Sequence, residues 1–99
     1  MTMPQPIQTT QLPVETLIRL RAELEAARRS NEARLEKSPQ PDDISMAVHR
    51  RSREAHDEIV AALSRIEDGS FGICETCLGP ISSVRLDAMP HTRYCMACA

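Results

Sequence analysis

The sequence C-E-T-C at residues 74–77 is followed, after seventeen residues, by C-M-A-C at residues 95–98. Each C-x-x-C pair forms a tight turn that places two thiolates on one side of a metal ion, and two such turns complete a tetrahedron. This spacing is typical of a four-cysteine zinc site, so the pattern predicts one structural zinc ion. Its four predicted ligands are Cys74, Cys77, Cys95 and Cys98. Four protein ligands leave no open coordination position, which argues against a catalytic zinc.

The same cysteines admit two other interpretations, namely two disulfides or a dithiol redox site. Residues 1–12 carry neither the basic nor the apolar segment of a secretory signal, which favours metal ligation over disulfides. Zinc would also supply stability that a segment of about thirty residues with few large side chains lacks. His91, four residues before Cys95, would become a ligand only if the cysteine pattern were misread.

The composition narrows the class of protein. The 99 residues carry a net charge of −2, and 41% are hydrophobic but only 2% are aromatic. Apolar content dominated by Ala, Leu, Ile, Val and Met favours packed helices over a β-sandwich or barrel. The acidic balance argues against broad electrostatic binding to DNA or to an anionic membrane, and no apolar run is long enough for a membrane span. Because phosphate-binding loops and nucleophile-elbow motifs are also missing, we do not expect an enzyme.

Two helical segments precede the cysteines. Residues 14–37 carry a stripe at steps of three and four, and a second stripe runs from the aspartate pair at 42–43 to about Asp68. Pro39 and Pro41 separate them, because proline removes a backbone donor and restricts the residue before it. The first stripe consists of Leu17, Leu20, Leu24, Ala27, Asn31 and Leu35. The second stripe consists of Val48, Arg51, Ala55, Ile59, Ala62 and Ile66, with Leu63 beside it.

The short connection between these segments predicts that the helices pack as antiparallel neighbours. The predicted fold is mainly α: an antiparallel two-helix coiled-coil hairpin followed by a small four-cysteine zinc finger. We expect a disordered arm at residues 1–12, the hairpin at 13–68 with its tip at 38–43, and the finger at 69–99. Gly69 stands where a left-handed residue would end the second helix.

The tip half of the hairpin is rich in charge. Its basic residues are interleaved with glutamates, so this region is either an ordinary solvated surface or a docking surface for a partner. The residues of the candidate docking face are Arg28, Arg29, Arg34, Arg50 and Arg53. Asp42 and Asp43 at the turn either cap the second helix or present carboxylates to a cationic or metal site of a partner.

Residues 59–98 resemble the DksA/TraR family of bacterial zinc-finger proteins. The resemblance is most specific in R-I-E-D-G-S-F-G-I-C-E-T-C at residues 65–77, and it continues through P-I at 80–81, R-L-D-A-M-P at 85–90 and Y-C-M-A-C at 94–98. It implies a cytoplasmic transcription regulator that is a monomer and binds RNA polymerase. It also implies that the protein binds neither specific DNA sequences nor a membrane. In that family the hairpin enters the secondary channel of the polymerase. The tip then approaches the catalytic centre and alters promoter complexes, often in stress or growth control.

The resemblance also suggests particular tip residues. The tip of family members reads D-x-x-D-x-A, and here Asp42, Asp43 and Ala47 offer these residue types in shifted spacing. Some members bind guanosine tetraphosphate through basic residues near the finger. The matching positions here are Glu58, Met89 and Ala99, which are not basic. We therefore expect no alarmone binding at that place.

Two alternative functions stay open. One is a zinc ribbon that binds nucleic acid or the ribosome, and the other is a thiol redox switch in which an oxidant ejects zinc. The finger carries Arg85 and Arg93 against Glu75, Asp87 and the adjoining Asp68, which offers little neutralisation of phosphates. The basic tip half of the hairpin is the feature that supports nucleic-acid binding.

Overall fold

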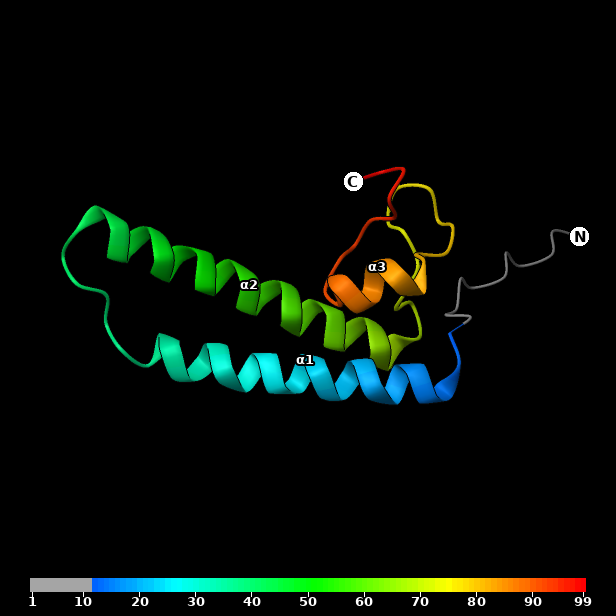
Figure 1. Ribbon diagram of the computed structural model, residues 1–99, viewed down its shortest axis with the longest axis horizontal. Coiled ribbons are helices and arrows are strands. Elements are labelled where there is room, and N and C mark those ends of the chain that lie inside the picture. The colour runs from blue at the N-terminus through cyan, green and yellow to red at the C-terminus, as the bar shows by residue number, and fades with distance from the viewer. Residues whose placement is uncertain (1–11) are drawn as a thin grey trace, which may run out of the picture.

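The computed structural model describes residues 12–99, and nearly all of the arm expected at residues 1–12 lies outside the described residues. The chain forms two long helices, α1 (Val14–Leu35) and α2 (Asp43–Asp68), and a short helix α3 (Ser83–Ala88). Figure 1 shows α1 and α2 side by side and antiparallel, with α3 and the carboxyl-terminal segment against the end of the hairpin where α1 begins. The molecule is elongated, with principal dimensions of 60 × 26 × 26 Å. The expected mainly α hairpin with a cysteine cluster after it is confirmed.

Both ends of α2 are capped, with Asp42 as the N-cap of the two candidate aspartates and Gly69 as the expected left-handed residue at the end. Asp42 has an extended backbone, and its side chain accepts a hydrogen bond of 2.8 Å from the backbone N–H of Ser45. At the other end Gly69 has a φ of +84°, and its N–H donates to the carbonyl of Arg65. A left-handed residue is favourable here because glycine has no Cβ. These two caps fix the ends of a helix of 26 residues.

The connection between the helices begins earlier than the sequence predicts. α1 ends at Leu35 instead of about Lys37, and the connection runs over residues 36–42. The N–H of Lys37 bonds to the carbonyl of Arg34, three residues earlier, which tightens the last turn. Ser38 precedes Pro39 and is therefore disfavoured in the helical region.

The core lies where the base of the hairpin meets the finger. Leu20 and Leu24 from α1 are buried against Ile59 and Ala62 from α2. The finger contributes the remaining buried residues of the cluster, which are Phe71, Cys74, Ile81 and Leu86. The hairpin and the finger therefore share one apolar core.

The tip half of the hairpin has no core of its own. Asn31 is the last buried residue of α1 and Ile59 the first of α2, and no residue between them is buried in the part of the chain that the structure describes. In Figure 1 the two helices diverge towards the connection. The stripe predicted that Val48 and Arg51 face the first helix. This prediction was wrong, because both side chains are exposed. Where the helices separate, a stripe at steps of three and four no longer faces a partner helix. None of the described helices combines the length and apolar character needed to cross a membrane.

Candidate functional site

The first cysteine knuckle is closed by backbone hydrogen bonds. The N–H of Cys74 donates to the carbonyl of Gly79 over 2.8 Å, and the N–H of Leu78 donates to the carbonyl of Cys74 over 2.9 Å. Leu78 has a φ of +61° and is the one non-glycine residue with positive φ in the described chain. An isolated antiparallel bridge between Ile73 and Pro80 holds the two sides of this turn together. The knuckle therefore keeps its shape although its left-handed residue is a leucine.

The second knuckle lies beside the first. The N–H groups of Cys98 and Ala99 both donate to the carbonyl of Cys95, and the N–H of Glu75 donates to the carbonyl of Arg93 over 2.9 Å. This last bond joins the two knuckles across about twenty residues of chain. Two turns that are separate in sequence thus become one site.

The four cysteine side chains converge. Their Sγ atoms all lie within 4.8 Å of one another, and those of Cys77 and Cys95 are 3.7 Å apart. Zinc–sulfur bonds of about 2.3 Å in a tetrahedron place sulfur atoms about 3.8 Å apart, so the cluster fits one zinc ion. Cys74 is fully buried in the core, whereas Cys77 is exposed. No histidine joins the group, so His91 does not replace a cysteine.

The arrangement of the two knuckles shifts the pKa of three of the cysteines. Backbone hydrogen bonds from Cys77 and Cys95 lower the pKa of Cys74 to about 6. A hydrogen bond with the side chain of Cys95 is the main cause that raises the pKa of Cys98 to about 12, and the pKa of Cys77 is also raised. Binding of zinc releases thiol protons, because thiolates are the ligand form for this ion.

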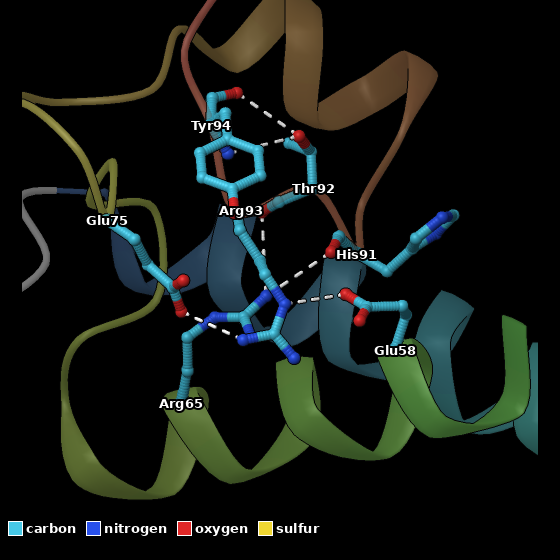
Figure 2. A network of polar contacts seen from close by, with 7 residues as sticks. All are labelled: Glu58, Arg65, Glu75, His91, Thr92, Arg93 and Tyr94. Atoms are coloured by element: carbon cyan, nitrogen blue, oxygen red, sulfur yellow. Dashed lines mark hydrogen bonds and ion pairs between the residues drawn. The ribbon is translucent and has the colours of Figure 1, made fainter. Parts of the chain in front are cut away.

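A network of hydrogen bonds and ion pairs connects the finger to α2 (Figure 2). Arg93 donates from Nε to Glu58 over 2.7 Å and from Nη1 to Glu75 over 3.0 Å. Arg65 donates from Nη2 to the carbonyls of His91 and Thr92 over 3.3 and 3.5 Å. The arginine at position 93 therefore bridges a carboxylate of the hairpin and a carboxylate of the first knuckle.

The network has clear electrostatic effects. The hydrogen bond from Arg93 lowers the pKa of Glu58 despite partial burial. Burial, followed by repulsion from Arg93, lowers the pKa of Arg65. In the sequence, Arg93 stands out only as a charge of the finger and Arg65 only as the first residue of the motif at 65–77. Their partners lie 18 to 35 residues away, so no local spacing could reveal them.

The tip residues lie at the far end of the molecule from the cysteines (Figure 1). Asp42 is the N-cap of α2, and its hydrogen bonds with the backbone of Ser45 lower its pKa. Asp43 is the first residue of α2 and is exposed, and Ala47 lies one turn further on and is half-buried. The structure thus separates the two aspartates by role, since one is engaged as a cap.

The candidate docking arginines do not share one environment. Arg28 forms an ion pair with Glu32 over 3.4 Å. Arg34 lines a concave surface between the ends of α1 and α2, whereas Arg50 and Arg53 line a neighbouring one on α2. Arg29 is exposed on α1. Whether this set docks a partner stays a prediction.

Comparison with known families matches residues 69–99 to the prokaryotic dksA/traR C4-type zinc finger. The cysteine geometry and this match together confirm the prediction of one structural zinc ion. An uncharacterized protein of Aquifex aeolicus is 55% identical over 42 residues, which cover 42% of this chain and 29% of that protein. The RNA polymerase-binding transcription factor DksA of Escherichia coli is 32% identical over 66 residues, which cover 65% of this chain and 44% of that factor.

A solved structure extends the similarity to the hairpin. The transcription factor DksA2 from Pseudomonas aeruginosa superposes with a TM-score of 0.56 at 25% identity, over 84% of this chain and 74% of that one. The chain spans less than half the length of the curated relatives it matches. Residues 69–99 thus match the dksA/traR C4-type zinc finger, and the finger, the hairpin and the cysteine cluster together agree with the DksA/TraR family of C4-type zinc-finger proteins.

Proposed function

We propose that this chain is a transcription regulator that binds RNA polymerase. The observation that carries the proposal is the 66-residue similarity to DksA of Escherichia coli, which is named an RNA polymerase-binding transcription factor. The elongated hairpin with a finger at one end supports the same role. In this proposal zinc is bound by Cys74, Cys77, Cys95 and Cys98 and is structural.

The shape of the hairpin supports entry into the secondary channel of the polymerase. The molecule is 60 Å long and 26 Å across, so a narrow end can reach a site that the finger does not enter. At that end Asp43 presents an exposed carboxylate, whereas Asp42 shapes the start of α2. We assign the action near the catalytic centre to the tip residues Asp42, Asp43 and Ala47, with Asp43 as the acting carboxylate.

Most of the affinity then comes from surfaces away from the tip carboxylates. The candidate docking face of Arg28, Arg29, Arg34, Arg50 and Arg53 borders the tip on both helices. A charge at the tip acts on a distant element through its field or its hydrogen bonds, and it adds little contact area. Binding and regulation should therefore separate in suitable variants.

The test compares two single substitutions of carboxylates in the first turn of a helix. Asp43→Asn changes the tip, and Glu15→Gln is the matched control in the first turn of α1 at the base. We expect both variants to bind purified host RNA polymerase like the wild type, and only Asp43→Asn to lose the effect on the lifetime of promoter complexes. A wild-type chain that does not bind polymerase refutes the proposed function. A fully active Asp43→Asn variant refutes the role of the tip carboxylate.

A further inference from the structure

A groove lies between the diverging ends of the two helices. It has a volume of about 640 Å³ and is lined by residues from the end of α1, the connection and the first turns of α2. This volume falls within the range of roughly 300–1,000 Å³ that is usual for binding sites. Its apolar walls include Leu35, Pro39, Ile44 and Val48. Ile44 is 79% exposed and Val48 is 57% exposed, so the groove leaves large apolar side chains in contact with water.

The charges around this groove have one sign. Arg34 and Lys37 line it together with His49, and no Asp or Glu occurs among its described lining residues. Arg34 donates a hydrogen bond to Ser30 but has no acidic partner. The side chain of Asp42 is engaged in the cap of α2 beside the groove and does not line it. An apolar floor thus has a cationic rim without counter-charges.

The rest of the molecule treats its cations differently. At the base, Arg19, Arg21 and Arg93 each pair with carboxylates, whereas Arg65 and Arg85 have no ion pair and donate to backbone carbonyls. In the tip half, most cations of the described chain have no ion pair, and these are Arg29, Arg34, Lys37, Arg50, Arg51 and Arg53. Unpaired cations that line a groove with exposed apolar side chains, as Arg34 and Lys37 do, are characteristic of a surface that is completed by a partner.

We propose that this groove docks a segment of RNA polymerase that carries both apolar and acidic side chains, an inference that rests on the proposed function. Apolar side chains of such a segment fill the space above Ile44 and Val48, and its carboxylates pair with Arg34 and Lys37. An amphipathic helix in a groove between helices is a common mode of peptide recognition. Charge-assisted pairs at the rim then fix its orientation.

A nucleic acid fits the apolar floor and the cationic rim of this groove less well than such a protein segment does. Phosphates would pair with the cations, but binding of single strands also uses aromatic side chains for base stacking. The aromatic residues of the described chain are Phe71 and Tyr94, and both belong to the finger. The apolar floor of the groove would stay uncovered against a phosphate backbone. The groove therefore favours an apolar and acidic protein segment.

The first experiment measures the affinity of the full chain for purified host RNA polymerase. Val48→Ser and Arg34→Gln change the groove. Their matched controls are Val84→Ser in α3, where Val84 is 77% exposed, and Arg51→Gln, an exposed and unpaired arginine of α2 outside the groove. We expect the two groove variants to bind roughly tenfold more weakly and the controls to stay within about twofold of the wild type. All four side chains are exposed, and Arg34 is the one among them with a hydrogen bond, to Ser30. Circular dichroism should therefore show unchanged helix content in all four variants.

Each result has a definite meaning. If all four variants bind polymerase like the wild type, the groove proposal is wrong while the proposed function stands. If Arg34→Gln and Arg51→Gln weaken binding equally and Val48→Ser has no effect, attraction is diffuse and electrostatic, as for a nucleic acid, and the proposal is again wrong. If the wild type itself does not bind polymerase, the proposed function is wrong, and this inference, which rests on it, is wrong as well.

A second experiment identifies the chemistry of the occupant. A photo-crosslinking amino acid replaces Val48 in the groove, and in a control chain it replaces Val84 in α3. After irradiation with polymerase, mass spectrometry should find a peptide at position 48 that contains apolar and acidic residues and is absent from the Val84 control. A crosslink from position 48 to nucleic acid, or to a polymerase segment without acidic residues, overturns the proposal.

Discussion

At the start of α2 two neighbouring aspartates do different things. The carboxylate of Asp42 accepts the N–H of Ser45 over 2.8 Å, and Asp43 points its charge into solvent from the first turn. Asn can replace Asp as an N-cap because its side-chain oxygen accepts the same bond, whereas Ala cannot. This difference separates a structural role from a role of charge.

Replacing Asp42 should affect stability according to capping ability. We expect Asp42→Ala to lower the midpoint of thermal unfolding by several degrees, and Asp42→Asn to leave it nearly unchanged. Because the pKa of Asp42 is lowered in the folded state, its contribution is present above the pKa of the unfolded chain and is lost as pH falls through the folded pKa. Thermal unfolding followed by circular dichroism checks this. Equal midpoints for Ala and Asn would show that the cap contributes nothing.

At the finger–hairpin junction, Arg93 already has two carboxylate partners. A concave surface of about 460 Å³ at the junction is lined by Glu58, Met89 and Arg93 among others. Arg85, which also lines it, donates to the carbonyl of Tyr94 over 2.8 Å. The positive charge of this surface is thus largely neutralised or directed elsewhere.

Under the proposed function, we therefore expect guanosine tetraphosphate not to bind at this junction and not to change the affinity for polymerase. Calorimetry of the protein with polymerase, with and without the nucleotide, should give dissociation constants within about twofold. An alarmone-dependent gain in affinity that disappears in Glu58→Ala or Met89→Ala would contradict this expectation.

At the scale of the elements, the base of the hairpin depends on a few buried leucines. Leu24 is 2% exposed and packs in the core, whereas Ile18 on the same helix is 64% exposed. We expect Leu24→Asp to lower the free energy of unfolding by about 3–5 kcal/mol, since it creates a cavity and buries a charge without a partner. Ile18→Asp is the matched control and should change the stability little. Urea unfolding of both variants measures the difference, and similar values would contradict the assigned core.

Zinc removal should reach beyond the finger. Phe71, Cys74 and Leu86 share the core with Leu24 and Ile59, so a finger that unfolds uncovers the apolar base of the helices. We expect a strong chelator to lower both the helix content and the midpoint of unfolding, and one equivalent of zinc to restore them. A hairpin that keeps its full stability without zinc would show that the two elements are energetically independent.

The sequence was informative where the structure is governed by local rules. The C-x-x-C spacing and the left-handed Gly69 depend on residues a few positions apart, and both predictions were confirmed. The sequence also placed the N-cap of α2 at Asp42 or Asp43, and the structure has it at Asp42. The tip seam could not be predicted in the same way. Val48 follows the helical period, but whether it is buried depends on how far the two helices diverge. The bridge of Arg93 between Glu58 and Glu75 likewise arises only when the finger is seated on α2.

Across the whole molecule, the stabilising contacts are concentrated at one end. The finger, the core and the ion pairs Arg19–Asp87 and Arg21–Glu67 gather at one end. The other end consists of two helices joined by residues 36–42. The same chain therefore combines a rigid base with an end that can adjust to what it contacts.

The absence of a core among the described residues between Asn31 and Ile59 has a consequence for the free energy of local opening. Backbone amides exchange with solvent deuterium when a helix opens, and helices without buried contacts open at lower free energy. We expect protection factors in α2 to fall from residues 59–66 towards residues 46–56, and those in α1 to fall from residues 20–24 towards residues 32–35. Equal protection along α2 would contradict this gradient. Folding would then begin at the zinc-bound end and proceed outward, so that the connection at residues 36–42 is the last part of the described chain to become ordered.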